Sequence, residues 1–219
     1  MFSVKQLKNN NFMKIKNKSF KDKNKKWLKR HVDDEFVQKS ISDNYRSRAA
    51  YKLVEIIEKY KILNEAKNVI DLGSAPGSWC QVLKNHGKSL NSIIAVDILE
   101  MEEIKGVTFY RSDFLSPEFE KISKTIGEFD LVLSDISPNL SGNKVSDFLL
   151  SKDLVENALS YSLQNLNTNG HFVAKYFRTG DISDVLTICK RNFHKVTSFK
   201  PKSSRKNSSE IYLVCLRKK

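Results

Sequence analysis

A chain of 219 residues with 40% hydrophobic content and a net charge of +13 predicts one globular domain with a sizeable core. Its apolar runs are too short to cross a bilayer, which excludes a membrane-spanning protein. The three cysteines, Cys80, Cys189 and Cys215, lie far apart without a CxxC spacing, which argues against a disulfide framework and a zinc site and indicates a reducing, cytoplasmic compartment.

The basic charge is concentrated at the N-terminus. Residues 1–30 hold eleven Lys and Arg side chains against one acid, Asp22, so this segment carries +10 and the rest of the chain +3. Such a segment is either a solvated tail without a partner or a binding segment for a polyphosphate, which it attracts through counterion release. The aromatic residues between the lysines can stack on bases, which favours nucleic acid as the partner.

We therefore expect residues 1–26 to form a flexible basic arm and residues 27–219 to form a single domain. No apolar segment of the secretory type follows the first eight residues. A mitochondrial transit peptide remains an alternative for this Lys-rich, acid-poor terminus, although its scarcity of arginine argues against one.

Two helices are predicted before the first strand. Residues 26–38 have the amphipathic pattern of a short helix. Residues 46–60 predict a longer one, because apolar side chains recur at helical spacing. These side chains are Ala50, Leu53, Ile56, Ile57 and Tyr60, and Lys52 lies beside their stripe.

From residue 68 onward, apolar strands alternate with helical patterns. Strands are predicted at 68–72, 92–97, 107–110, 129–135 and 171–177, and helices near 78–86, 116–125, 150–166 and 181–192. This alternation predicts an α/β fold with a mostly parallel sheet and helices on both faces. Residues 194–200 and 211–217 are strand-like and are joined by a loop too short for a helix, so we expect an antiparallel hairpin at one sheet edge.

Acids and glycines gather at the predicted strand ends. Gly73 and Gly77 lie in a tight turn between the strand at 68–72 and the next helix, where a ligand can approach the main chain. Four successive strands end in, or lead into, Asp71, Asp97, Asp113 and Asp135. A single aspartate at a strand end suits a turn or a helix cap, but four at one edge indicate a binding site.

The pattern disfavours a dinucleotide. The GxGxxG fingerprint is absent, and a rim of acids would repel a pyrophosphate. A positively charged nucleoside without phosphate fits better, and S-adenosylmethionine (AdoMet) is such a molecule.

Five segments resemble, in order, the motifs of the FtsJ/RrmJ (RlmE) family of ribose 2′-O-methyltransferases. They are RSRAAYKL (46–53), DLGSAPGSW (71–79), SDISPNLSG (134–142), FVAKYF (172–177) and SSR to EIY (203–212). The resemblance extends from Trp27 to the C-terminus. Two features depart from the family pattern: Ser78 replaces a usual glycine, and the basic arm is longer than in bacterial members.

The resemblance implies a class I AdoMet-dependent fold of seven strands with AdoMet as the cofactor and no metal. It implies a cofactor pocket of Gly77, Trp79, Asp97, Asp113 and Asp135. It also implies a catalytic tetrad of Lys52, Asp135, Lys175 and Glu210. The predicted fold supports part of this tetrad independently, because Asp135 and Lys175 leave neighbouring strands at the same edge.

Methyl transfer to a ribose hydroxyl is an in-line displacement that needs positioning and removal of a proton. We expect Lys175 to remove that proton or to steer the hydroxyl, with Lys52 as a second cation that favours the neutral form of Lys175. Asp135 would orient Lys175, and Glu210 would hold a lysine or the ribose. The competing interpretation is that both lysines contact phosphates and both acids are their ion-pair partners.

The expected substrate is RNA, because DNA lacks the 2′-hydroxyl. Basic residues flank the tetrad in sequence and are expected to line the RNA approach; they are Arg46, Arg48, Lys202, Arg205 and Lys206. The family points to a uridine in the A-loop of large-subunit rRNA, as free rRNA or in a ribosomal particle, with the protein acting as a monomer. Methylation of tRNA or of mRNA caps is an alternative, as is a non-catalytic RNA-binding role in ribosome assembly.

Overall fold

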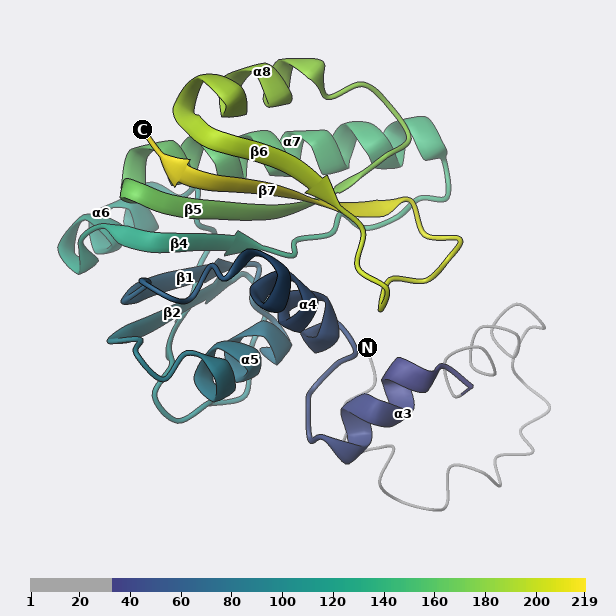
Figure 1. Cartoon of the computed structure of the whole chain (residues 1–219), viewed down its shortest axis with the longest axis horizontal. Helices are drawn as coiled ribbons and strands as arrows, with labels where there is room; N and C mark the ends of the chain where they lie inside the picture. The colour runs from purple at the N-terminus through teal and green to yellow at the C-terminus, as the bar shows by residue number, and fades with distance from the viewer. Residues whose placement is uncertain (1–32) are drawn as a thin grey trace.

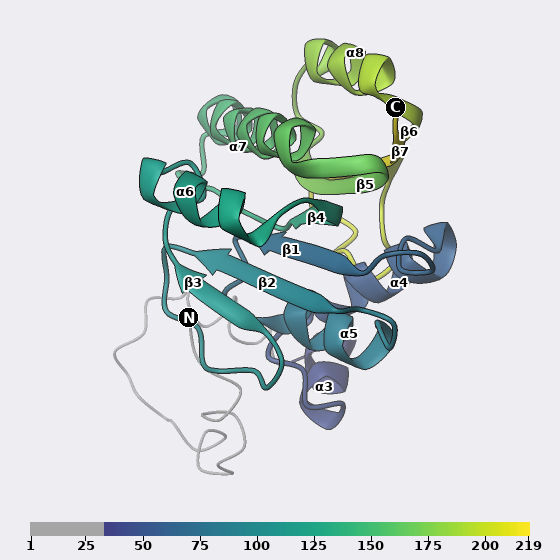
Figure 2. The ribbon, with the colours of Figure 1, turned by 90° about the vertical axis from the view of Figure 1, so that its left-hand side faces the viewer.

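The computed structural model describes residues 33–219, so the predicted arm at 1–26 and the beginning of the helix predicted at 26–38 lie outside the described residues. The described chain forms one seven-stranded sheet with helices on both faces (Figures 1 and 2). The strands are β1 (Asn68–Leu72), β2 (Ser92–Asp97), β3 (Thr108–Arg111), β4 (Phe129–Ser134), β5 (Leu166–Phe177), β6 (Phe193–Phe199) and β7 (Glu210–Lys218). The helices are α3 (Glu35–Ser42), α4 (Ala50–Tyr60), α5 (Ser78–His86), α6 (Pro117–Ile126), α7 (Lys144–Asn165) and α8 (Ser183–Asn192).

The sheet has the strand order β3-β2-β1-β4-β5-β7-β6. The pairs from β3 to β5 are parallel, whereas β7 runs antiparallel to both β5 and β6. The predicted α/β fold and its C-terminal hairpin are therefore confirmed. Since the loop between β6 and β7 is too short for a crossover, β7 must return beside β6, and it does so between β6 and β5.

Two apolar layers hold the helices on the sheet. On one face, α6, α7 and α8 contribute Phe119, Leu159 and Val185 to a buried cluster. On the other face, α4 and α5 bury side chains such as Leu53 and Val82 against the sheet. Figure 2 shows these two layers on opposite sides of the strands. None of the described helices is both long and apolar enough to cross a membrane.

The helix bounds before the sheet differ from the prediction. Over its described part, the helix predicted to end at Gln38 instead begins at Glu35 and continues to Ser42. Asp34 fixes this start, because its side chain accepts hydrogen bonds from the main-chain N–H groups of Phe36 and Val37. Helix α4 begins at Ala50 rather than at residue 46, since residues 46–49 form a turn that ties the chain to α5.

Helix α7 begins six residues earlier than predicted. Asn143 caps it by accepting from the amides of Val145 and Ser146, and the next turn carries the exposed apolar side chains of Val145 and Leu149. These side chains do not continue the buried stripe, so periodicity alone missed the first turns. Strand β5 likewise begins five residues before the prediction, directly after α7. The remaining bounds agree within two residues.

Candidate active site

The predicted catalytic side chains continue one face of the sheet. Side chains alternate between the faces of a strand, so every second residue points to the same side. On the α4-facing side, Leu133 of β4 is buried and is followed two residues later by Asp135. In β5 and β7 the same face carries Lys175 and Tyr212, which are direct partners in the antiparallel register, and Glu210 precedes Tyr212 by two residues on that face. The sheet thus places charges where its apolar face ends.

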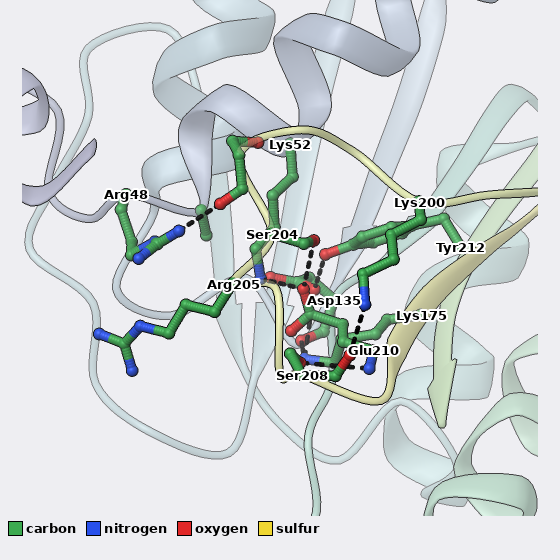
Figure 3. Close-up of polar contacts among 12 residues, drawn as sticks. Arg48, Lys52, Asp135, Lys175, Lys200, Ser204, Arg205, Ser208, Glu210 and Tyr212 are labelled. Atoms are coloured by element: carbon green, nitrogen blue, oxygen red, sulfur yellow. Dashed lines mark hydrogen bonds and ion pairs between the residues drawn. The ribbon is translucent and has the colours of Figure 1, made fainter. Parts of the chain in front are cut away.

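Asp135 and Lys175 form the first charged pair. Lys175 Nζ lies 3.2 Å from Asp135 Oδ1 and donates a hydrogen bond to the Asp135 main-chain oxygen at 2.7 Å (Figure 3). The Tyr212 hydroxyl donates to Asp135 Oδ1 at 2.7 Å. Burial acts to raise the pKa of Asp135, but the charges of Lys175 and Lys52 and the Tyr212 hydrogen bond outweigh it and lower that pKa. Asp135 is therefore an ionised acceptor that fixes Lys175 from two sides.

Lys52 and Glu210 form the second charged pair. Lys52 projects from the first turn of α4, and its Nζ lies 2.6 Å from Glu210 Oε1. The Ser204 hydroxyl donates to the same oxygen at 3.0 Å. Lys52 Nζ also lies 6.0 Å from the centroid of the Tyr212 ring, and its charge acts on Asp135, so the two pairs influence each other.

The arrangement keeps two lysines and two carboxylates together at the end of the sheet. The side chains of Lys175 and Lys52 are only 6% and 11% exposed, so neither is a solvated surface cation. Burial and the negative charges of Asp135 and Glu210 raise the pKa of Tyr212, which therefore stays a hydrogen-bond donor. Such a site can orient a hydroxyl group and move a proton in surroundings that exclude most water.

The glycine turn after β1 lies next to this centre. Gly73 has a φ of +73°, and an added Cβ there would lie 2.2 Å from Ile136 Cγ1. Gly77 has a φ of +100°, and its Cβ would lie 2.7 Å from an Arg46 guanidinium nitrogen and 2.8 Å from Met101 Sδ. Both positions therefore require glycine, and the absence of a Cβ lets a ligand approach the main chain of this turn closely.

Main-chain amides hold the acids of the next two strand ends. Asp97 accepts from the N–H groups of Ala75 and Leu99, each at 2.8 Å, through different oxygens. Asp113 accepts from Leu115 N–H at 2.9 Å and is exposed. Each carboxylate is thus fixed in direction and keeps lone pairs for a ligand. Exposed apolar side chains accompany them along the chain, and these are Ile98, Leu99 and Leu115.

These residues fit AdoMet. The carboxylates of Asp97 and Asp113 can accept from ribose hydroxyls and an adenine amine, and the apolar side chains suit an adenine ring. Among the described residues, Asp71 Oδ1 and Ser74 Oγ are buried without a hydrogen-bond partner. Two such oxygens at the glycine turn suit a ligand that carries hydrogen-bonding groups.

Trp79 takes a different position from the one expected of a pocket residue. Its ring is 2% exposed, its indole N–H donates to the Ala49 carbonyl at 2.9 Å, and its ring lies 5.8 Å from that of Tyr212. The side chain thus belongs to the core beneath Tyr212. The main chain of Trp79 lies in the first turn of α5, beside Gly77.

The basic residues expected to line an RNA approach fall into two groups. Arg46 donates to the main-chain carbonyls of Pro76, Glu102 and Glu103, so its contacts tie the cofactor-side loops together. Arg48 pairs with Asp34 and donates to a carbonyl of the C-terminal loop, defined here as residues 200–209. The other three, Lys202, Arg205 and Lys206, are exposed on that loop.

Ser78, which stands where the family usually has glycine, is buried and shares a 2.9 Å hydrogen bond with the Ser47 hydroxyl. This contact joins α5 to the turn before α4. The side chain is therefore accommodated without disturbing the glycine turn.

Four further residues of the site were not predicted. Tyr212 holds Asp135, Ser204 holds Glu210, and Glu55 and Asp34 hold the C-terminal loop. The spacing of Tyr212, two residues after Glu210 in a strand, places both on one face and could have revealed it. Ser204 lies six residues before Glu210, but across an irregular loop in which spacing gives no such signal, and the contacts of Glu55 and Asp34 join segments distant in sequence. Within residues 33–219, no cluster of His, Cys, Asp and Glu suits a metal ion.

Comparisons with known proteins agree with this geometry. Residues 45–218 match the FtsJ-like methyltransferase family. A relative from Rickettsia bellii (strain RML369-C), named ribosomal RNA large subunit methyltransferase E, is 43% identical over 218 residues, covering 96% of each chain. A relative of the same name from Sinorhizobium fredii (strain NBRC 101917 / NGR234) is 43% identical over 92% of this chain and 84% of its own. A solved Plasmodium falciparum protein, assigned as a ribosomal RNA methyltransferase, superimposes with a TM-score of 0.68 at 34% identity, covering 80% of this chain and 98% of its own.

Proposed function

The chain belongs to the FtsJ-like methyltransferase family, and from that premise we propose that it methylates a ribose 2′-hydroxyl in large-subunit ribosomal RNA, with AdoMet as the methyl donor. The observation that carries this proposal is the pairing of Lys175 with Asp135 and of Lys52 with Glu210, next to a glycine turn lined by acids. The names of the Rickettsia and Sinorhizobium relatives support the RNA class.

AdoMet, when bound, supplies an electrophilic methyl group. We assign its binding to Asp97, Asp113, the main chain at Gly77 and Trp79, and the side of Asp135 that faces the turn. Two main-chain amides orient the Asp97 carboxylate before the cofactor binds, so its side chain loses little conformational freedom when the ribose hydroxyls bind. Arg46 keeps the loops on both sides of the pocket together.

On the substrate side, Lys175 is assigned to position the 2′-hydroxyl and, as a neutral amine, to accept its proton while the methyl group passes from the sulfonium to the hydroxyl oxygen. Asp135 and the main-chain carbonyl at the same residue fix the Lys175 amine, and Tyr212 fixes Asp135. The Lys52–Glu210 pair lies close to Tyr212 and is assigned to holding the ribose and its phosphate. Positioning and proton removal together are the two demands of this displacement.

We propose that the methylated nucleotide is a uridine in the A-loop, in free rRNA or within a ribosomal particle. The exposed Lys202, Arg205 and Lys206 offer charge for the RNA backbone beside the tetrad. We further propose that the enzyme acts as a monomer in the cytoplasm, with residues 27–219 as its single catalytic domain.

The test is methyl transfer from labelled AdoMet to unmodified large-subunit rRNA, followed by mapping of 2′-O-methyl positions. One new 2′-O-methyl uridine in the A-loop is expected. If the labelled methyl group appeared in tRNA alone, the substrate would be tRNA and not rRNA. AdoMet binding without transfer to rRNA, ribosomal particles or tRNA would instead support a non-catalytic RNA-binding protein.

A further inference from the structure

Asp34 connects helix α3 to two arginines that are distant in sequence. Its Oδ1 caps α3 by accepting from Phe36 N–H at 3.1 Å and Val37 N–H at 3.4 Å. Its Oδ2 pairs with Arg48 and accepts from Arg205 Nε at 3.1 Å. The Asp34 side chain is 10% exposed and faces two guanidinium groups, so its charge does more than cap a helix.

Arg48 carries this connection toward the catalytic centre. Besides Asp34, its guanidinium contacts the Ser203 carbonyl in the C-terminal loop and lies 5.6 Å from the centroid of the Phe36 ring. The next residue in the loop, Ser204, donates its hydroxyl to Glu210. A continuous set of contacts therefore extends from Asp34 through Arg48 and residues 203–204 to the Lys52–Glu210 pair. Figure 3 labels Arg48, Ser204, Glu210 and Lys52 of this set.

Electrostatics make Asp34 the vulnerable member of this set. Burial and the charge of Arg205 both act on Arg48 and lower its pKa, although Arg48 stays charged. Without the Asp34 carboxylate, two guanidinium groups would face each other with no anion between them, and one of them is only 15% exposed. We expect Arg48 then to move and to release the Ser203 carbonyl.

A second anchor makes the expected disturbance local. Glu55 of α4 accepts from the main-chain N–H groups of Lys202 at 2.7 Å and Ser203 at 2.8 Å. The C-terminal loop would thus stay attached to α4 when Asp34 is changed. What would be lost is the fixed direction of residues 203–204, and with it the position of Glu210.

We propose that Asp34 is a positioning residue for the Lys52–Glu210 pair, acting through Arg48 and residues 203–204. The inference rests on the proposed methyl transfer to RNA. It makes the N-terminal edge of the described chain, which precedes the segment matched by the family, part of the catalytic unit.

Asp34→Asn is the test, because asparagine is nearly isosteric and caps a helix as well as aspartate does through Oδ1, while the amide NH2 in place of Oδ2 removes both the charge and the acceptor that face the two arginines. Asp33→Asn is the matched control: it removes the same charge from the exposed neighbouring residue. We expect Asp34→Asn to lower kcat about 10- to 100-fold, the range for a small misplacement of catalytic groups, while AdoMet affinity stays within twofold. The KM for RNA should stay equal or fall, because the variant gains net positive charge.

The direction of the KM effect separates positioning from a lost RNA contact, which would raise KM. Ser204→Ala is a second variant, which interrupts the same contacts next to Glu210. The double variant Asp34→Asn/Ser204→Ala should be no slower than the slower single variant, since both act on one path. Multiplying effects, or a kcat equal to that of Asp33→Asn, would overturn the proposal.

Amide hydrogen exchange provides a readout that needs no RNA. Exchange in residues 203–210 should be faster in Asp34→Asn than in Asp33→Asn, while α5 and the β1 turn stay unchanged. Unchanged exchange would overturn the positioning role even if the wild-type protein transferred no methyl group. An inactive wild-type protein with faster exchange in Asp34→Asn would overturn only the proposed function.

Discussion

The two sides of the site are held together by different means. On the cofactor side, Asp97 and Asp113 are oriented by main-chain amides close to them in sequence or in the adjoining turn. On the substrate side, Lys52, Lys175, Asp135 and Glu210 are oriented by one another and by the hydroxyl groups of Ser204 and Tyr212. An acid fixed by amides keeps its place when a neighbouring side chain is removed, whereas a charge fixed by another charge does not.

This difference predicts how each side responds to substitution. A single substitution on the cofactor side should lower AdoMet affinity only by the contacts of the residue that is changed. Single changes on the substrate side should affect several groups at once and act mainly on the rate. The following experiments test that contrast, from the largest expected effect to the smallest.

The largest effect is expected at Lys175. Lys175→Ala should lower the single-turnover rate about 10²–10⁴-fold, the usual contribution of a general base, with AdoMet affinity retained and RNA binding weakened only modestly. Lys175→Arg keeps the positive charge but cannot give up its proton near neutral pH, so it should restore RNA binding and not turnover. Rates at saturating RNA provide the measurement, with the exposed Lys195→Ala as control. A near-wild-type rate for Lys175→Arg would show that Lys175 acts as a cation and not as the base.

The buried acid of the glycine turn offers a pH test of the cofactor side. Burial raises the pKa of Asp71 from 3.8 to about 8, although a hydrogen bond from Cys80 opposes the shift. The folded state therefore holds a proton that the unfolded chain releases near pH 4, so this group makes the protein less stable as pH rises from about 4 to about 8. Asp71→Asn removes that loss.

We expect the free energy of unfolding of cofactor-free Asp71→Asn to exceed that of the wild type by a few kcal/mol at pH 8, with little difference near pH 4. Urea unfolding at several pH values measures this. Asp113→Asn, a change of the same type at an exposed acid, is the control. A constant difference across the range would mean that Asp71 is ionised in the folded protein throughout.

A bounded effect is expected at Asp97. Asp97→Ala removes acceptors for the ribose hydroxyls, which should cost about 1–3 kcal/mol, or about five- to 150-fold in AdoMet affinity. Calorimetry measures the affinity, and Glu100→Ala, at an acid whose side chain is 81% exposed, is the control. The rate at saturating AdoMet should change far less than in Lys175→Ala. Unchanged AdoMet affinity would show that Asp97 only accepts hydrogen bonds from the amides of Ala75 and Leu99 and does not bind the cofactor.

The smallest effect concerns residues 1–24, which lie outside the described residues. The segment lacks core-forming periodicity, so its deletion should leave the melting temperature and AdoMet affinity unchanged. RNA affinity should fall and its dependence on salt should become shallower, because phosphate contacts are lost. RNA affinity between 50 and 200 mM salt, a range set by the expected counterion effect, provides the measurement. An unaltered salt slope would show that the segment makes no contact with RNA.

The amino-acid sequence by itself determined the order of the elements, the parallel sheet and the antiparallel hairpin. Periodicity of apolar residues fixes these features, because a strand buried on both faces or a one-sided helix must show its pattern locally. It also determined the cofactor turn, since glycine at a positive φ followed by a helix is a local arrangement, as Gly73 and Gly77 show. The strand ends at Asp97 and Asp135 belong to the same class of local signal.

Only the tertiary structure decided which partner Lys52 takes, whereas the pairing of Asp135 with Lys175 was expected from neighbouring strand ends. Lys52 meets Glu210 because α4 covers the face on which β7 returns beside β5, and no spacing in the chain encodes that meeting. Trp79 was expected at the cofactor; its ring packs beneath Tyr212 in the core, which leaves its main chain beside Gly77 for that role. The contacts of Arg48 and Asp34 also depend on the tertiary structure, since these residues meet where α3 and the C-terminal loop come together. The physical reason is that an ion pair depends on side-chain positions in space, which the sequence fixes only through the packing of the whole fold.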